Sequence, residues 1–400
     1  MVTLAATAGV AWDEHVLHRC RSLLAHEVTQ QPWSGRAGRS KNKTRKNEHK
    51  WRTYLADFVH LLRQAILAVV ETIPSHAALS GAWGDLYAEL CECTREGQCV
   101  AFDTSLKRTA YMLYCLKKRS QYMANVFALV ETGYPAVIEL FDQSSSAPII
   151  VSSFGGGPGF SAAGFLAFLF FNLATRKRHV EWHVLDYEQG WSEQCRIMET
   201  ALRAVRKALL VETLPTIDIK FASCDVRYSI YDEAGLNSAV PGIARRAEMF
   251  VFSFVLVENE LALRETKFQF LAELYSASKR AVTNHFLASV FMDSTHRLWP
   301  EIVRVLEQHM PNLGYVPKIT CMKKDLPTNA MLALHPNSDP RLASPDICSY
   351  GFSILAHDKR NMLSRYELDC NAQTSFRKVR DENEIAEDIE VGQLLNEGSL

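Results

Sequence analysis

The spacing of hydrophobic positions changes about a third of the way along the chain. Between residues 51 and 142 apolar side chains recur at intervals of three and four, which predicts amphipathic helices. After Gly133, short apolar runs bounded by turn residues alternate with amphipathic stretches. Strands separated by helix-length segments are typical of a parallel sheet covered on both faces. The pattern therefore predicts an α/β fold preceded by a helical N-terminal domain.

Seven strands are predicted for this sheet. They lie at 148–154, 180–186, 217–222, 249–257, 286–292, 315–322 and 349–355. Helices are predicted between them at 161–177, 192–210, 238–247, 261–277 and 297–309. The last two strands are joined by a segment without a helical pattern, which indicates an antiparallel hairpin. The expected fold class is thus a seven-stranded, mostly parallel, doubly wound sheet with a C-terminal antiparallel hairpin.

The distribution of charge suggests where the segments of the chain begin and end. Residues 34–52 carry eight Lys or Arg against the single acid Glu48 and lack apolar periodicity, which predicts a solvated linker. Residues 381–400 hold seven acids and no Lys or Arg, which predicts a solvated tail. The expected division is an N-terminal helical segment at 1–33, a basic linker at 34–52, a helical domain at 53–145, the α/β domain at 146–357 and a tail at 358–400.

Composition narrows the class of protein only a little. With 48% hydrophobic and 22% charged residues and a net charge of -1, the chain has the composition of a folded globular protein. Ten Cys are too sparse for a disulfide scaffold, and the spacing of Cys91, Cys93 and Cys99 lacks the second ligand pair of a zinc ribbon, so no metal is expected. The longest apolar run, at 160–173, is shorter than a membrane span. We expect a soluble protein of the nucleus, nucleolus or cytoplasm.

A glycine-rich loop is the most informative stretch of the sequence. The strand at 148–154 runs directly into Gly155, Gly156, Gly157, Pro158 and Gly159, and a helix is predicted from Ser161. Glycines allow a tight turn and a close approach of ligand to backbone. The N-terminus of the helix behind them provides unpaired N–H groups and a partial positive charge. The loop therefore indicates a site for a nucleotide-like ligand, with a purely structural turn as the alternative.

Two families of nucleotide-like ligand fit this loop. Gly157, Gly159 and Ala162 match the dinucleotide fingerprint G-x-G-x-x-A. The run Gly-Gly-Gly-Pro-Gly resembles more closely the first motif of class I S-adenosylmethionine-dependent methyltransferases, and the layout of residues 146–357 is similar to that family as well. The resemblance implies S-adenosylmethionine as the cofactor and methyl transfer as the activity. An NAD-binding oxidoreductase and a non-catalytic methyltransferase-like scaffold are the alternatives.

The resemblance also implies which residues bind the cofactor: Gly155, Gly156, Gly157, Gly159, Asp186, Trp191 and Asp225. Asp186 ends the second strand, where the family places an acid that binds both ribose hydroxyls. Asp225 ends the third strand, where an acid or amide accepts from the adenine amine. Each acid taken alone could equally be an ordinary strand-end residue, and Trp191 could pack against the adenine or belong to the core. Ser153 stands where the family usually has an acid.

The methyl acceptor is less clearly indicated. The resemblance places Ser253, Glu258 and Asn259, after the fourth strand, beside the transferred methyl group, with Glu258 as a base or as a helix cap. The basic residues of 34–52 favour RNA as a partner. The expected contacts are Arg36, Arg39, Lys41, Lys43, Arg45 and Lys46. The glycine loop followed by an acid and a tryptophan is also similar to ribosomal-RNA uridine methyltransferases of eukaryotes. We therefore expect a base of ribosomal RNA as the acceptor, with a protein or a small molecule as the alternative.

Overall fold

The computed structural model of the protein describes residues 10–29, 41–70, 74–96, 100–133, 147–172, 179–209, 216–232, 235–281, 287–293, 298, 301–302, 304–305, 308, 318–323 and 347–355. The predicted linker up to residue 40, most of the predicted helix at 297–309 and the tail at 358–400 lie outside these ranges. Within them, no helix is both long enough and apolar enough to cross a membrane.

Four helices precede the sheet: α1 (Glu14–Thr29), α2 (Lys41–Val69), α3 (His76–Glu96) and α4 (Ser105–Gly133). The prediction of an irregular linker is wrong from Lys41 onward, because helix α2 begins there. Lys and Arg are good helix formers. The apolar stripe that starts at Trp51 is buried, so tertiary packing of this stripe stabilises a helix that extends back into the basic segment.

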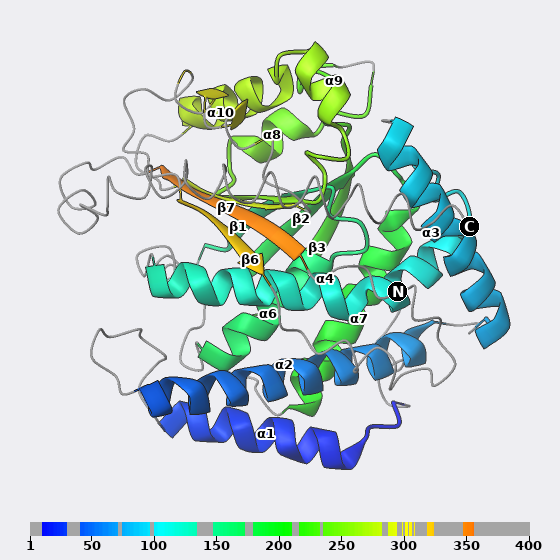
Figure 1. The fold of residues 1–400 in the computed structure, drawn as a ribbon, viewed down its shortest axis with the longest axis vertical. Coiled ribbons are helices and arrows are strands. Elements are labelled where there is room, and N and C mark those ends of the chain that lie inside the picture. Colours follow the sequence, from blue (N-terminus) through cyan, green and yellow to red (C-terminus); the bar gives the residue numbers. More distant parts are fainter. Residues whose placement is uncertain are drawn as a thin grey trace.

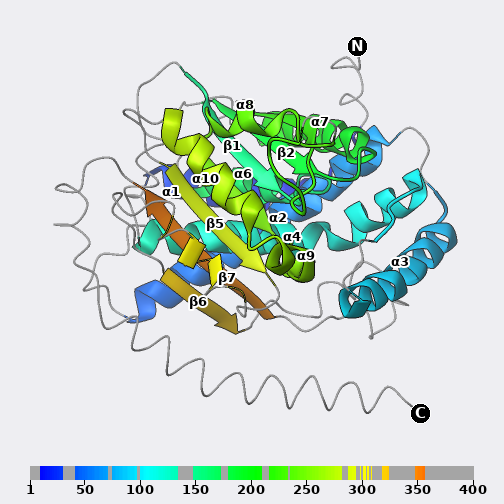
Figure 2. The ribbon, with the colours of Figure 1, turned by 90° about the horizontal axis from the view of Figure 1, so that it is seen from above.

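The sheet has seven strands in the order β3-β2-β1-β4-β5-β7-β6. They are β1 (Ile149–Phe154), β2 (Val180–Asp186), β3 (Ile217–Ser223), β4 (Met249–Ser253), β5 (Leu287–Asp293), β6 (Lys318–Lys323) and β7 (Ile347–Leu355). Strands β1 to β5 pair in parallel, whereas β7 is antiparallel to both β5 and β6. The predicted α/β fold with a parallel sheet is confirmed (Figures 1 and 2).

The helices that follow β1 are α6 (Phe160–Asn172), α7 (Trp191–Ala208), α8 (Val240–Ala244), α9 (Glu260–Glu265) and α10 (Gln269–Ala281). Two of the predicted boundaries are wrong. Strand β4 ends at Ser253 rather than at residue 257, because Phe254 takes a positive φ of 62° that no strand can hold. The predicted helix at 261–277 is divided in two, because Lys267 and Phe268 also take positive φ values, 52° and 59°.

Helices cover both faces of the sheet (Figure 1). On the face that carries α6 and α7, helix α4 packs against α6, and helices α1 and α2 pack on the outer side of α6 and α7. Side chains from all of these helices join one hydrophobic cluster with strands of the sheet. Helix α4 lies so close to α6 that a Cβ on Gly164 would come within 2.2 Å of the Ser120 carbonyl oxygen. The opposite face packs against α8, α9 and α10 in a second cluster. The N-terminal helices thus share a core with the α/β part of the chain.

The topology fixes where a ligand site can form. Strand β1 pairs with β2 on one side and with β4 on the other, so the direction in which the chain adds strands reverses between β1 and β4. Loops that leave the carboxyl ends of parallel strands on the two sides of such a switch point diverge and leave a crevice. The loops after β1, β2, β3 and β4 all emerge at this edge of the sheet.

Candidate functional site

The glycine loop after β1 has the geometry that its sequence predicts. Gly155, Gly157 and Gly159 all take positive φ values, 62°, 50° and 87°. Helix α6 begins directly after the loop, and the Ala163 N–H donates to the Gly159 carbonyl at 3.1 Å. A Cβ on Gly155 would lie 2.5 Å from the Cβ of Val255, so the glycine loop touches the loop after β4. A residue with a Cβ would be strained at these φ values, and at position 155 it would also collide with Val255. The loop therefore requires glycine.

Asp186, at the end of β2, points its carboxylate at the glycine loop. Its Oδ2 accepts from the Gly157 N–H at 3.0 Å, and its Oδ1 accepts from the Glu188 N–H at 3.2 Å. The residue is 6% exposed, and this burial raises the pKa of Asp186 to about 6. Two backbone N–H groups therefore fix the orientation of a carboxylate that still has free lone pairs for a ligand.

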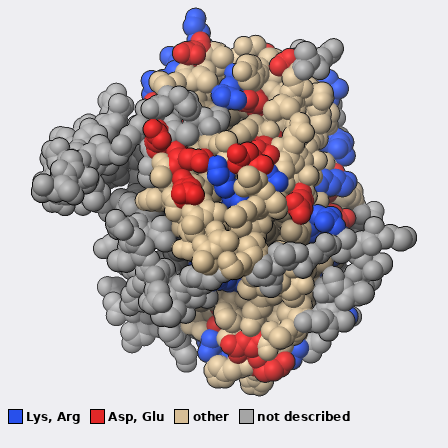
Figure 3. Space-filling view, turned by 90° about the vertical axis from the view of Figure 1, so that its right-hand side faces the viewer, with Lys and Arg blue, Asp and Glu red and all other residues tan. Residues whose placement is uncertain are grey.

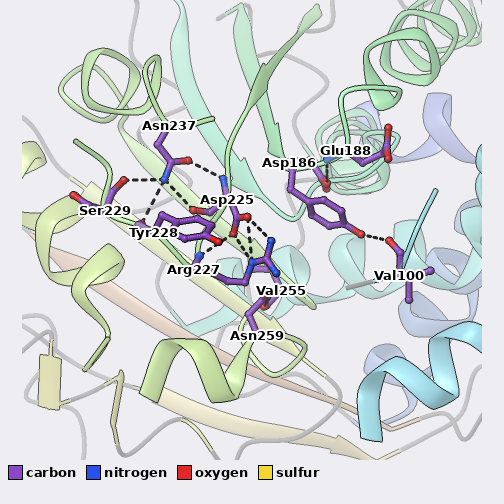
Figure 4. A network of polar contacts seen from close by, with 11 residues as sticks. Val100, Asp186, Glu188, Asp225, Arg227, Tyr228, Ser229, Asn237, Val255 and Asn259 are labelled. Carbon is purple, nitrogen blue, oxygen red and sulfur yellow. Dashed lines mark hydrogen bonds and ion pairs between the residues drawn. The ribbon is translucent and has the colours of Figure 1, made fainter. Parts of the chain in front are cut away.

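Asp225, at the end of β3, is bound to its own neighbour. The Arg227 guanidinium donates through Nε to Oδ1 at 2.9 Å and through Nη2 to Oδ2 at 2.6 Å, and the Arg227 N–H also donates to Oδ1 at 3.0 Å. The buried amide of Asn237 closes the turn, because it accepts from the Asp225 N–H and donates to the Asp225 and Ser229 carbonyls (Figure 4). Arg227 and Asn237 carried no sequence signal. Arg227 already donates to both carboxylate oxygens of Asp225. The predicted hydrogen bond from an adenine amine would therefore have to go to an oxygen that also accepts from Arg227.

A cleft of about 800 Å³, counting its open mouth, lies between these loops. Most of the predicted site residues line it: Gly155, Gly157, Asp186, Trp191, Asp225, Glu258 and Asn259. The cleft does not include three others. Gly156 is buried against Val184, Gly159 lies against Met198 and Ile219, and the Ser253 hydroxyl accepts a hydrogen bond from Ser161 at 3.1 Å. Their predicted roles stay predictions.

The loop after β4 carries the acid of the cleft that is most accessible. Glu258 is exposed to the cleft but surrounded by protein, and this desolvation raises its pKa to about 8, while the positive charge of Arg119 acts in the opposite direction. Asp293 anchors the loop by accepting from the Val257 N–H at 2.9 Å. The Asn259 amide donates to the Val255 carbonyl at 2.8 Å, so it holds the loop closed. Glu258 does not cap helix α9, because Asn259 occupies the N-cap position.

One wall of the cleft comes from the N-terminal helices and the segment that joins α3 to α4. Leu90 of α3, Val100 and Phe102 of the following segment, and Tyr111 of α4 all line it. The Tyr187 hydroxyl donates to the Val100 carbonyl, which ties this segment to the end of β2 (Figure 4). Tyr111 belongs to a predicted helical stripe, and nothing in its spacing separates a cleft residue from a core residue.

Trp191 belongs to an aromatic group at this wall. Its ring centroid lies 4.8 Å from that of Phe102 and 5.6 Å from that of Tyr111, and its side chain is 1% exposed. Trp191 therefore packs mainly as a core residue and presents only an edge to the cleft. Ser153, in the position of the usual family acid, is fully buried in β1 and does not line the cleft. Its hydroxyl makes no hydrogen bond to the described residues.

The metal and RNA predictions concern residues that the structure describes only in part. Within the described ranges, no group of three or more His, Cys, Asp or Glu could hold a metal ion. The side chains of Cys91, Cys93 and Cys99 lie outside the description, as do those of the six predicted RNA contacts. Arg36 and Arg39 precede the described part of the segment, and Lys41, Lys43, Arg45 and Lys46 belong to the first turns of α2.

The fold and the cleft define an open α/β protein with a cleft at the switch point of its sheet. Neither protein-family models nor curated proteins give a match to the chain. Among solved structures, similar ones include the CMeT domain of the citrinin polyketide synthase (10% identity, 88% of this chain and 92% of that chain, TM-score 0.33) and the DszA carbon methyltransferase (13%, 90% and 95%, TM-score 0.31). Another is precorrin-6y C5,15-methyltransferase from Geobacter metallireducens GS-15 (11%, 55% and 85%, TM-score 0.26).

Proposed function

We propose that the chain is a methyltransferase that uses S-adenosylmethionine. One observation carries the proposal. Residues from four separate strand ends, which the sequence resemblance assigned to cofactor and acceptor, line a single cleft: Gly155 and Gly157 after β1, Asp186 after β2, Asp225 after β3 and Glu258 after β4. These positions span about a hundred residues, so only the parallel sheet brings them together.

The residues of the cleft fit such a cofactor. The loop at Gly155 and Gly157 has no Cβ on the cleft side, so a ligand can approach its backbone. Asp186 can accept from two adjacent hydroxyls, and the bonds from Gly157 and Glu188 keep it in place. S-adenosylmethionine supplies a methyl group on a positively charged sulfur when it is bound. Methyl transfer then mainly requires that the acceptor is held in line, and the loop that carries Glu258 is the part of the chain placed to do so.

Calorimetry on the full chain tests this function. We expect binding of S-adenosylmethionine and of S-adenosylhomocysteine, and no binding of NAD. Asp186→Asn should weaken binding by about tenfold or more, the effect of losing charge-assisted hydrogen bonds. Asp218→Asn is the matched control. Asp218 is an acid of strand β3 that accepts a hydrogen bond from Arg203 at 2.8 Å, and it does not line the cleft. Binding of NAD alone, or of none of the three ligands, would refute the proposal.

RNA is the acceptor that the sequence favours. What supports it is the set of eight cations in residues 34–52. Deletion of this segment would remove the start of α2, including buried Trp51, so we suggest Gln at Arg36, Arg39, Lys41, Lys43, Arg45 and Lys46 instead. If these residues contact phosphates, the variant should bind an RNA oligonucleotide more weakly and with a flatter salt dependence. An unchanged salt dependence would contradict the contact.

A further inference from the structure

The charge of the cleft lining is unusually one-sided. Among the lining residues that the structure describes there are three acids, Asp186, Asp225 and Glu258, and no Lys, Arg or His. Arg227 compensates only Asp225, which it binds through both carboxylate oxygens. Asp186 accepts hydrogen bonds from the backbone N–H groups of Gly157 and Glu188 rather than from a cation. A bound cation would therefore favour the ionised forms of Asp186 and Glu258, whose pKa values burial raises to about 6 and about 8.

An aromatic wall faces these acids. Tyr111 and Phe102 line the cleft, with ring centroids 5.1 Å apart, and the ring of Tyr111 lies 3.9 Å from the position of a Cβ on Gly157. Burial raises the pKa of Tyr111. The charge of Arg119 opposes this rise and the charges of Glu258 and Asp186 add to it, so these groups lie within electrostatic reach of Tyr111. Aromatic faces combined with carboxylates are the combination by which proteins recognise ammonium groups.

We propose that the methyl acceptor is an amine, which enters the cleft as an ammonium ion and is recognised by Glu258 together with the aromatic ring of Tyr111. This inference rests on the proposed methyltransferase function and names its class of acceptor. Glu258 is the lining acid on the loop after β4, next to Val255, which touches the glycine loop. It is also the most exposed of the three lining acids, and Asp186 and Asp225 are each 6% exposed.

The step balances with Glu258 as the base. The Glu258 carboxylate takes one proton from the ammonium group, which leaves a neutral amine with a free lone pair. The lone pair forms the new N–C bond to the methyl carbon while the C–S bond breaks and its electrons stay on sulfur. The products are a methylated ammonium ion, S-adenosylhomocysteine and protonated Glu258, which then loses its proton to solvent.

The surroundings of Glu258 suit this role. The groups that influence its charge are Arg119 of α4, Asp186 of β2 and Asp293 of β5. Arg119 is held with its guanidinium carbon 3.3 Å from the centre of the Phe254 ring, at the start of the same loop. Because desolvation holds the pKa of Glu258 near 8, the group can both take up and release a proton near neutral pH.

The charge of the cleft lining favours a small amine over a polyanion. Figure 3 views the side of the molecule that carries α3, where acidic and basic side chains lie next to one another near the middle of the face. A phosphate backbone that entered the cleft would meet Asp186 and Glu258 without a lining cation to neutralise it. RNA is therefore the competing outcome in the test.

Competition between matched ligands tests the inference. The full chain is saturated with S-adenosylhomocysteine, and binding is measured for phenethylamine, benzylamine and agmatine, each against the carboxylate and the alcohol of the same skeleton, and for a uridine dodecamer. We expect at least one amine to bind about tenfold or more tightly than its carboxylate, as a charge-assisted hydrogen bond implies. Glu258→Gln should remove this preference, and Tyr111→Leu should reduce it more than Tyr111→Phe does.

Glu260→Gln is the matched control, since Glu260 bonds Arg264 at 3.0 Å, lies two residues from Glu258 and does not line the cleft. It should leave the amine preference unchanged. If no amine binds better than its carboxylate, or if Glu258→Gln leaves the preference intact, the inference is overturned. Binding of the uridine dodecamer without amine preference would overturn it in favour of RNA. Failure of S-adenosylhomocysteine to bind at the outset would instead refute the proposed function.

Discussion

Replacement of Gly155 by alanine probes the contact between the glycine loop and the loop after β4. Gly155 and Gly157 have similar positive φ values, 62° and 50°, so alanine meets a similar backbone penalty at either position. This penalty is roughly 1–2 kcal/mol for a left-handed residue, offset in part by the lower entropy of alanine in the unfolded chain. The two positions differ in the space available. A Cβ at 157 meets nothing closer than 3.9 Å, whereas a Cβ at 155 lies 2.5 Å from the Cβ of Val255.

The expected free energies follow from this difference. Gly157→Ala should reduce the free energy of unfolding by about 1 kcal/mol, which is the backbone effect alone. Gly155→Ala should reduce it by about 2–4 kcal/mol, because overpacking in a filled site adds roughly 1–3 kcal/mol to the backbone effect. Urea unfolding followed by tryptophan fluorescence measures both variants against the parent protein.

The partner position supplies a control. Val255→Gly should restore more of the stability of Gly155→Ala than Val255→Ala does. Alanine removes the Cγ atoms at 2.9 and 3.3 Å but keeps the Cβ at 2.5 Å, whereas glycine removes all three. A double-mutant cycle gives the coupling between the two positions. Equal losses for Gly155→Ala and Gly157→Ala, or equal rescue by the two Val255 variants, would show that the loops do not touch as described.

Three further predictions concern the charged groups of the cleft. Burial raises the pKa of Asp186 in the folded state to about 6, above its value of about 4 in the unfolded chain. The contribution of this group to stability is therefore present below about pH 4 and is lost as pH rises from about 4 to 6. Asp186→Asn should remove this part of the pH dependence of urea unfolding. The affinity of S-adenosylmethionine relative to S-adenosylhomocysteine, which lacks the positive charge on sulfur, should increase as pH rises through about 8, because Glu258 ionises there. Calorimetry on Glu258→Gln should show a flat ratio. Arg227→Gln should lower the free energy of unfolding by about 1–3 kcal/mol, because it leaves Asp225 without its charged partner. Arg227→Lys should recover only part of this loss, since lysine cannot bind both carboxylate oxygens at once. Equal stability of the two variants would contradict the bidentate contact.

The sequence by itself determined the architecture of the α/β part and predicted several of the residues that line the cleft. Strands β1 and β2 are buried on both faces, so their apolar runs are recognisable without any knowledge of their neighbours. The glycine loop is recognisable because only glycine adopts its positive φ values without strain. Asp186 and Asp225 follow two parallel strands of one sheet, and the carboxyl ends of parallel strands meet at the same edge.

The tertiary structure alone decided the lining of the cleft and the partners of its acids. Tyr111 and Phe102 reach the site because α4 packs against α6 at Gly164, a contact between segments distant in sequence. Arg227 occupies Asp225 through a turn that Asn237 closes from twelve residues away. The division between α9 and α10 follows from the positive φ values at Lys267 and Phe268, which no propensity predicts. Hydrophobic periodicity shows which face of each segment is buried. The features named here depend instead on which segments pack against one another, and local periodicity contains no information on those pairings.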